Sequence, residues 1–321
     1  MSLEMLAGGL ATSVQDLGRP GWQAQGVGAA GALDADCLRL ANALVGNAAE
    51  AAGLEITLRG PCLRFTRAGA FALCGAPFEL TLDGVPCDPW RCHPAHAGQV
   101  LAVGRALRGA RAWLALAGGI DLPPLLHSRS SDLNSALGPL PRTLRAGDTL
   151  PLGTAARLPP ASPARWSLDP APWFAEAGGV PLRLLPGAHY ARLSQHARAA
   201  LYGSVFTVAA QSSRAGLRLD GTRLDLVQPL ECVSSGCVPG VLQLPPGGQP
   251  ILLLAEHPVS GGYPRIAQAA AVDLPRLAQA VPGTALRFAA VDMDTATRLL
   301  LARRTARTQL EARIRARLEP T

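Results

Sequence analysis

The segment from residue 256 to 265 concentrates side chains that can do chemistry. It reads Glu-His-Pro-Val-Ser-Gly-Gly-Tyr-Pro-Arg and follows the apolar run Ile251 to Ala255. A buried strand that ends in such a segment delivers an acid, a base, hydroxyl groups and backbone donors to one rim. We therefore predict catalytic roles for the residues of this segment that carry those groups: Glu256, His257, Ser260, Tyr263 and Arg265.

Two other segments carry polar groups suited to binding a substrate. Residues 15–19 place the carboxylate of Asp16 and the guanidinium of Arg19 three residues apart, and a fixed Arg suits an anionic substrate. Alternatively, Asp16 pairs with Arg19 only to fix the turn that follows. The hydroxyl groups of residues 128–131 either cap a short helix or help backbone N–H groups to hold an anion.

Glycine at 261 and 262 is suited to binding because a side chain there would keep the backbone N–H groups away from a small substrate. Together with the polar groups of the other two segments, these positions form the predicted binding set. The predicted substrate-binding residues are Gln15, Asp16, Arg19, Ser128, Arg129, Gln243, Gly261 and Gly262.

Composition excludes several classes of function. All thirty basic residues are Arg and none is Lys. The chain therefore cannot carry biotin on itself, form a Schiff base with pyridoxal phosphate or complete a GxxxxGK[ST] phosphate loop. Any biotin that takes part in its function must be attached to another polypeptide.

The net charge of +7 is not spread over the chain. Residues 298–317 hold seven Arg and one acid, Glu311, which is 7 − 1 = +6 and leaves the remainder nearly neutral. Aromatic residues make up 4% of the chain and do not alternate with this Arg cluster, as a base-stacking surface requires. We predict no nucleic-acid partner. The chain shows no long apolar run and no secretory signal, so we expect a cytoplasmic protein with no membrane association.

Two further patterns are set aside. Cys87, Cys92, His93 and His96 resemble zinc ligands, but their spacing departs from common zinc motifs, so we favour a hairpin with incidental Cys and His and predict no metal. The segment Gly26–Gly31 matches GxGxxG, yet no hydrophobic strand precedes it. We expect a flexible loop there rather than a dinucleotide site.

The elements that position these residues are mostly short strands. Apolar or alternating runs bounded by Gly, Pro or Asp-Gly predict strands at 54–58, 70–74, 78–82, 100–103, 112–117, 182–185, 205–209, 241–244, 251–255 and 286–291. One clear helix begins after Asp34, a good N-cap, and ends near Gly46. The pattern predicts a mainly β protein.

A faint duplication of strand, Gly-Gly and Asp-Leu patterns suggests two related domains. We predict an N-terminal β domain at 1–155, a Pro- and Ala-rich linker at 156–180, a C-terminal β domain at 181–292 and an Arg-rich helix at 293–321. The expected apolar stripe of this helix comprises Leu299, Ala302, Ala306, Leu310, Ile314 and Leu318. The helix either packs on its own domain or docks a partner.

Seven motifs in family order carry a resemblance over roughly residues 5–292. They are TSVQDLGRPG (12–21), GALDADCLRLANALVGN (31–47), LEITLRGP (54–61), LALAGGID (114–121), SRSSDL (128–133), RAGLRLDG (214–221) and GVLQLPPGGQPILLLAEHPVSGGYPRIA (240–267). The sequence resembles the carboxyltransferase family that includes the C subunit of 5-oxoprolinase and allophanate hydrolase subunit 2. This resemblance implies two cyclophilin-like β-barrels.

For function, the resemblance implies work on small amide or urea-type substrates. The main interpretation is a subunit of ATP-dependent 5-oxoprolinase, which opens 5-oxoproline to glutamate together with its A and B subunits; ATP would bind in that complex. The alternatives are a carboxyltransferase acting on a urea-type substrate with a biotin carrier on another chain, or a non-catalytic partner of a kinase-inhibitor protein. Arg265 stands where the family usually has Lys, which keeps the charge but not a titrating amine.

Overall fold

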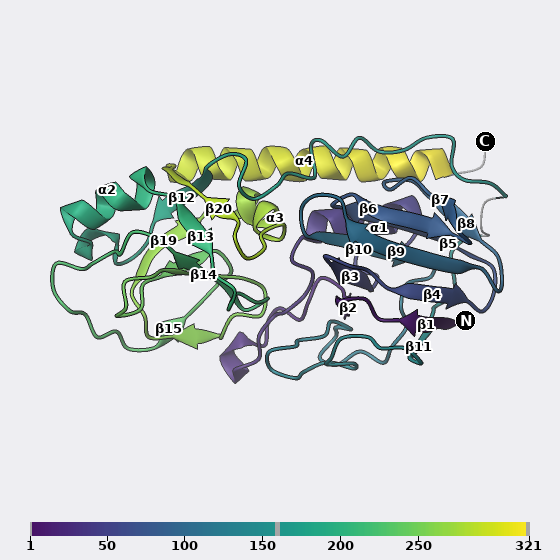
Figure 1. Ribbon diagram of the computed structural model, residues 1–321, viewed down its shortest axis with the longest axis horizontal. Coiled ribbons are helices and arrows are strands. Elements are labelled where there is room, and N and C mark those ends of the chain that lie inside the picture. Colours follow the sequence, from purple (N-terminus) through teal and green to yellow (C-terminus); the bar gives the residue numbers. More distant parts are fainter. Residues whose placement is uncertain (1, 158–160, 319–321) are drawn as a thin grey trace. The chain divides into compact units, whose positions relative to one another are not determined.

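The computed structural model describes residues 2–157 and 161–318, which fall into two compact units. The first comprises Met1–Arg19, Asp34–Ala175 and Ala306–Thr321, and the second comprises Pro20–Leu33 and Glu176–Thr305. The early segment Pro20–Leu33 thus belongs to the second unit. Figure 1 labels the helices and strands of the chain. The domain limits drawn from the sequence stay a prediction, and residues 158–160 of the predicted linker lie outside the described residues.

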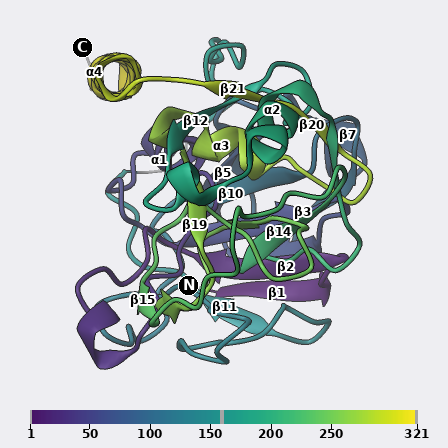
Figure 2. The ribbon, with the colours of Figure 1, turned by 90° about the vertical axis from the view of Figure 1, so that its left-hand side faces the viewer.

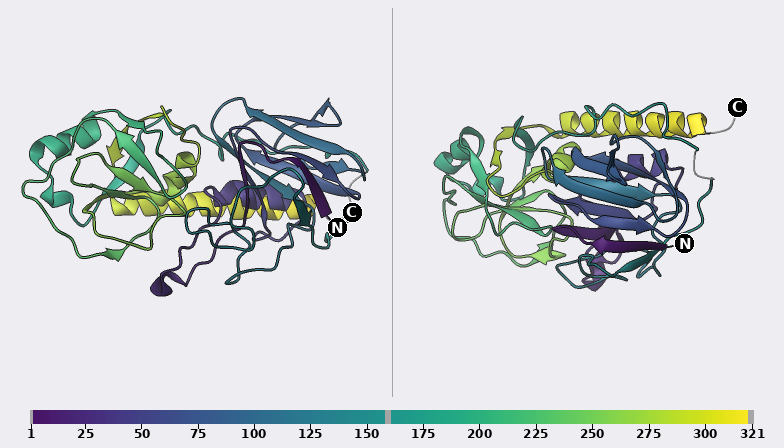
Figure 3. Two further views of the ribbon diagram at one scale, coloured as in Figure 1. Left: turned by 60° about the horizontal axis from the view of Figure 1, so that its bottom comes forward. Right: turned by 45° about the vertical axis from the view of Figure 1, so that its right-hand side comes forward.

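The first unit is built from two antiparallel sheets. Their strand orders are β11-β1-β4-β9-β6-β7 and β2-β3-β10-β5-β8. Figure 3 shows these strands running side by side. The strands are β1 (Ser2–Ala7), β2 (Ala11–Gln15), β3 (Gly53–Thr57), β4 (Cys62–Phe65), β5 (Gly69–Gly75), β6 (Phe78–Leu82), β7 (Val85–Pro86), β8 (His93–Ala95), β9 (Val100–Ala106), β10 (Arg111–Leu116) and β11 (Thr149–Pro151).

Helix α1 (Ala35–Leu44) packs against β5 and β10 of the five-stranded sheet. It begins as the sequence predicts, because the Asp34 side chain accepts a hydrogen bond from the backbone N–H of Cys37. It ends before Gly46, which has a φ of 75°, a conformation that glycine adopts without strain. Strands β5 and β10 are buried along almost their whole length, which explains their continuous apolar sequences.

The second unit is organised on one eight-stranded sheet of order β20-β13-β14-β17-β16-β19-β12-β21 and a small β15-β18 ribbon. Within the sheet β12 and β21 run parallel, whereas the other paired strands are antiparallel. Its strands are β12 (Leu182–Pro186), β13 (Phe206–Val208), β14 (Gly216–Asp220), β15 (Ser235–Gly236), β16 (Val241–Gln243), β17 (Ile251–Leu253), β18 (Ser260–Gly261), β19 (Arg265–Ala269), β20 (Ala285–Leu286) and β21 (Phe288–Ala290).

Short helices complete this unit: η1 (Gln23–Gln25), η2 (Tyr190–Arg192), α2 (Gln195–Gly203), η3 (Ala271–Asp273) and α3 (Leu274–Leu277). Helix α2 packs against β21, as Figure 2 shows. Its buried residues join a core that includes Phe206, Leu242, Leu252 and Phe288. The prediction of a mainly β chain with few helices is confirmed.

The C-terminal helix α4 (Met293–Leu318) is also confirmed, but the predicted apolar stripe is partly wrong. Ala302 and Ala306 are exposed, whereas Glu311 is buried and Arg307 half-buried. Arg307 donates to Asp36 at 2.6 Å and lies 3.3 Å from Glu311. An ion-pair cluster therefore occupies part of the buried face, and a search for apolar periodicity does not detect such a face.

Candidate functional site

The predicted catalytic segment lies in the second unit, between β17 and β19. The chain turns at residues 255–258 and then enters β18, which pairs with β15 so that Ser260 lies opposite Gly236 and Gly261 opposite Ser235. Ser260 is exposed. The strand that the sequence predicted at 251–255 is confirmed as β17, although it is two residues shorter.

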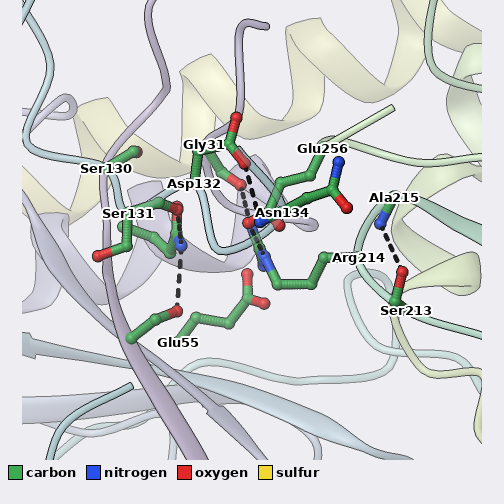
Figure 4. A network of polar contacts seen from close by, with 12 residues as sticks. Gly31, Glu55, Ser130, Ser131, Asp132, Asn134, Ser213, Arg214, Ala215 and Glu256 are labelled. Carbon is green, nitrogen blue, oxygen red and sulfur yellow. Dashed lines mark hydrogen bonds and ion pairs between the residues drawn. The ribbon is translucent and has the colours of Figure 1, made fainter. Parts of the chain in front are cut away.

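Glu256 is held in a buried ion pair. Its Oε1 accepts a hydrogen bond from Nε of Arg214 at 2.6 Å, with side-chain exposures of 2% for Glu256 and 9% for Arg214. Nη2 of Arg214 donates to the carbonyl of Gly31 at 2.6 Å, and the backbone N–H of Glu256 donates to the carbonyl of Arg214. Figure 4 shows Arg214 together with Glu256 and Gly31. Glu256 is thus fastened to Arg214, which precedes β14 and also holds the loop before Asp34.

His257 has a defined tautomer. Its Nδ1 lies 2.7 Å from the carbonyl oxygen of Pro258, and because a carbonyl only accepts, Nδ1 carries the proton. The lone pair of the neutral ring is therefore on Nε2. His257 is buried, with 7% of its surface exposed. The ring is a suitable general base through Nε2.

Gly261 packs closely against the side chain of Gln243. A Cβ atom at Gly261 would lie 2.6 Å from Nε2 of Gln243 and 3.3 Å from the sulfur of Cys237. Nε2 of Gln243 in turn lies 3.5 Å from that sulfur. Gly262 is also close-packed, since its Cβ would lie 3.1 Å from the carbonyl oxygen of Cys232. The structure therefore brings Gln243 and the glycine pair together.

Arg265 is anchored by a residue that the sequence did not single out. Its backbone N–H donates to Nδ1 of His189 at 3.0 Å, and its Nη1 donates to the carbonyl of Gly236 at 3.1 Å. The backbone N–H of His189 donates back to the carbonyl of Arg265. His189 lies 76 residues away in the sequence and belongs to no motif, so no local pattern identifies it.

A cavity of about 690 Å³ lies next to this segment within the second unit. Gly262 and Tyr263 line it, and Tyr263 is 46% exposed. The other walls come from Pro264 and from the segments 223–226, 229–232 and 244–246. Its mixture of apolar and charged walls is typical of small-molecule sites.

The remaining predicted binding residues form a separate cluster in the first unit. The carboxylate of Asp16 accepts hydrogen bonds from the hydroxyl groups of Ser128 (2.7 Å) and Ser130 (2.6 Å). It also accepts from the backbone N–H groups of Arg129 (2.5 Å) and Gly18 (2.8 Å). Asp16 is 6% exposed and Ser128 fully buried. Three of these four donors, from Ser128, Arg129 and Ser130, join the two predicted segments.

The neighbours of Asp16 strengthen the same junction. Nε2 of Gln15 donates to the carbonyl of Ser131 at 2.8 Å, and Arg19 donates to the carbonyl of Ser130. The guanidinium of Arg129 pairs with Asp121 and donates to the carbonyl of Leu122. The sequence left open whether Asp16 pairs with Arg19 or Arg19 receives an anionic substrate; in the structure, the hydrogen-bond partners of the Asp16 carboxylate are serine hydroxyl groups and backbone N–H groups.

The metal-like arrangement has structural contacts. The ring of His93 stacks on Phe71 with centroids 5.3 Å apart and contacts the carbonyl of Asp88 at 2.8 Å. Burial raises the pKa of the Cys92 thiol to about 11. Among the described residues, no group of three or more His, Cys, Asp or Glu can hold a metal ion. Within the same residues, no helix has the length and apolar character needed to cross a membrane.

Comparison with known proteins decides the family. Residues 25–290 match the family model described as "Carboxyltransferase domain, subdomain A and B". The chain belongs to this carboxyltransferase family. The resemblance predicted from the sequence motifs is therefore confirmed.

The family members most informative for this chain are bacterial. The C subunit of 5-oxoprolinase from Escherichia coli (strain K12) is 40% identical over 296 residues, which cover 92% of this chain and 93% of that protein. The Haemophilus influenzae protein of the same name is 35% identical over 292 residues, covering 89% and 90%. The Kluyveromyces lactis urea carboxylase crystal structure superposes with a TM-score of 0.86 at 27% identity, covering 95% of this carboxyltransferase chain and 29% of the larger enzyme.

Proposed function

We propose that this chain is a subunit of 5-oxoprolinase, an ATP-dependent amide-bond hydrolase that opens 5-oxoproline to glutamate. The observation that carries the proposal is the 40% identity that extends over almost the full length of both this chain and the C subunit of a bacterial 5-oxoprolinase. Its partners would be a smaller protein resembling the B subunit of that enzyme and a protein resembling its A subunit. The word "subunit" in the names of the two bacterial relatives supports this assembly.

We infer that the substrate amide binds at the cavity beside Gly262 and Tyr263. Opening an amide ring requires a base for water and fixed donors for the developing negative charge. The Nε2 lone pair of His257 suits the first role, and the backbone N–H groups of the glycine pair with the guanidinium of Arg265 suit the second. Tyr263, partly exposed at the cavity, supplies a hydroxyl for orienting the substrate.

Glu256 and Ser260 complete the proposed catalytic set in different ways. Glu256 would act by holding the turn that carries His257, since its carboxylate is bound to Arg214. Ser260 is exposed on the ribbon and can donate to a bound substrate. Gln243 would fix the position of the Gly261 backbone, because the two residues pack closely together.

The cluster around Asp16 is proposed to shape a binding loop in the first unit. Four donors surround the carboxylate of Asp16, and together with Gln15 and Arg19 it fixes the backbone of residues 128–131. Fixed backbone N–H groups next to Ser128 and Arg129 would then hold an anionic group within the first unit. On this proposal, the loss of Asp16 lowers affinity for that group by changing the shape of the loop.

ATP is proposed to bind in the assembled complex. The Gly26–Gly31 segment does not fit a nucleotide loop, because a 3-10 turn, η1, precedes it and Arg214 binds the carbonyl of Gly31. No step is assigned to ATP on this chain. Because the chain has no Lys, any biotin in an alternative reaction would reside on another polypeptide.

The test is reconstitution with candidate A and B subunits. We expect glutamate release from 5-oxoproline only when ATP and all three proteins are present, and no turnover by this chain alone. Full hydrolysis by the isolated chain would contradict the proposal that partner subunits are required. A complete complex that does not hydrolyse 5-oxoproline would contradict the proposed substrate.

The second candidate is carboxyl transfer to a urea-type substrate, which the TM-score of 0.86 to a urea carboxylase favours. The same reconstitution distinguishes it. Consumption of urea with a separate biotinylated carrier, without 5-oxoproline hydrolysis, would select this alternative. Binding to a kinase-inhibitor protein without turnover of either substrate would select a non-catalytic role.

A further inference from the structure

A thiol and an imidazole meet at the wall of the cavity in the second unit. Sγ of Cys232 lies 3.8 Å from Nε2 of His189. Cys232 lines the cavity and is partly exposed. The pair lies beside the predicted catalytic segment, since the carbonyl of Cys232 packs against Gly262. Neither residue belongs to the set assigned above to the proposed reaction.

Hydrogen bonds fix the tautomer of His189. Nδ1 accepts from the backbone N–H of Arg265, so the single proton of the neutral ring is on Nε2. Nε2 therefore donates toward the sulfur of Cys232. A donor in this position stabilises the thiolate relative to the thiol, and it cannot act as a base that removes the thiol proton.

The charges around the pair favour the same arrangement. Burial, followed by the positive charges of Arg265 and Arg192, lowers the pKa of His189. The ring is therefore neutral at pH 7 and keeps the tautomer that donates to sulfur. These two guanidinium groups belong to β19 and η2. The nearest acid along the chain, Glu231, is exposed to water, which screens its charge.

The other six cysteines lack this combination of access and donor. Four of them, Cys37, Cys74, Cys92 and Cys237, are buried, and burial raises the thiol pKa of the last three. Cys62 and Cys87 are partly exposed. Burial also raises the pKa of Cys87.

We propose that Cys232 is a modification site at which hydroperoxides oxidise the thiolate and a small thiol then caps it. In the first step sulfur attacks a peroxide oxygen, the O–O bond breaks, Cys232 is oxidised to a sulfenic acid and hydrogen peroxide is reduced to hydroxide. In the second step a thiol such as glutathione attacks the sulfenic sulfur, a disulfide forms and water leaves. The cap lies in the cavity beside Gly262 and Tyr263 and restricts access to it.

The first test measures labelling of the folded chain by iodoacetamide, with the seven cysteines resolved by peptide mass spectrometry. We expect Cys232 to react at least ~10-fold faster than Cys62 and Cys87, because the imidazole of His189 is directed at its sulfur. Hydrogen peroxide with glutathione should add one glutathione at Cys232. C232S should abolish that adduct, and the matched variant C87S should retain it.

A second variant tests the role of the imidazole. We expect H189F to slow labelling of Cys232 at least ~10-fold, because the donor to the thiolate is lost. If H189F unfolds, Cys74 and Cys92 will also react with the label. In that case the proposal is decided by the order of the cysteine labelling rates in the wild-type chain alone. Faster labelling of Cys62 or Cys87 than of Cys232, or an unchanged Cys232 rate in folded H189F, would overturn the proposal.

Discussion

The buried pair of Glu256 and Arg214 gives the sharpest stability prediction. The variant E256Q keeps the shape of the side chain but removes its charge, which leaves the Arg214 guanidinium buried without its counter-charge. Nε and Oε1 are 2.6 Å apart, and the two side chains are 9% and 2% exposed. At such burial, removing one partner of an ion pair typically destabilises a protein by about 3–5 kcal/mol. We expect a loss of that size in the unfolding free energy of E256Q.

The assay is equilibrium unfolding in urea followed by circular dichroism, with separate transitions fitted if the two units unfold independently. The matched control is E4Q, because Glu4 pairs with Arg64 at 2.9 Å with side chains 43% and 44% exposed. An exposed pair of this kind contributes no more than about 1 kcal/mol. The double variant R214M/E256Q should recover part of the loss, because neither charge then remains buried. A loss for E256Q no larger than that for E4Q would refute the reasoning.

Three further outcomes are expected. H257A should stay folded, with a lower melting temperature because a buried side chain is truncated, and should lose at least ~10²-fold in turnover of the assembled complex because it removes the proposed base. Turnover equal to that of the wild-type complex would show that His257 is not the base. G261A should displace Gln243, which a Cβ would approach to 2.6 Å, and should lower turnover of the assembled complex. G247A is the control and should retain turnover, because its Cβ would meet open space. The pKa of His189 is lowered, so the folded state favours the neutral ring. The contribution of His189 to stability is therefore complete above pH ~6.5 and is lost as the pH falls through the folded-state pKa. Between pH ~7.5 and ~5, the unfolding free energy measured in urea should fall less for H189F than for the wild-type chain.

Local sequence was sufficient to predict the elements that depend on neighbouring residues. The strand expected at 78–82 coincides with β6, and α1 begins after Asp34 as the capping pattern indicates. These features follow from alternation and from one side chain bonding a backbone group three residues away. Both determinants lie within a few residues, so they are visible in a single sequence.

The contacts that position the site lie far apart in the sequence and could not be predicted in this way. Asp16 meets Ser128 across 112 residues, and His189 meets Arg265 across 76. The buried face of α4 was predicted wrongly in part for a related reason: Arg307 and Glu311, which were not in the expected apolar stripe, lie on that face and form an ion-pair cluster with Asp36. Tertiary polar contacts carry no periodic signal along the chain.

The carboxylates of the predicted site residues Asp16 and Glu256 are both engaged in buried contacts, which indicates structural rather than chemical roles. Asp16 accepts four hydrogen bonds, and Glu256 is paired with Arg214 in a buried site. Oxygen lone pairs engaged in such contacts are poorly placed to take a proton from water, because each transfer would first break a hydrogen bond or leave a buried charge uncompensated. The imidazole of His257 differs, since its Nδ1 proton is bound to Pro258 and the Nε2 lone pair remains. The geometry therefore favours proton transfer by histidine, with both carboxylates holding the loops in place.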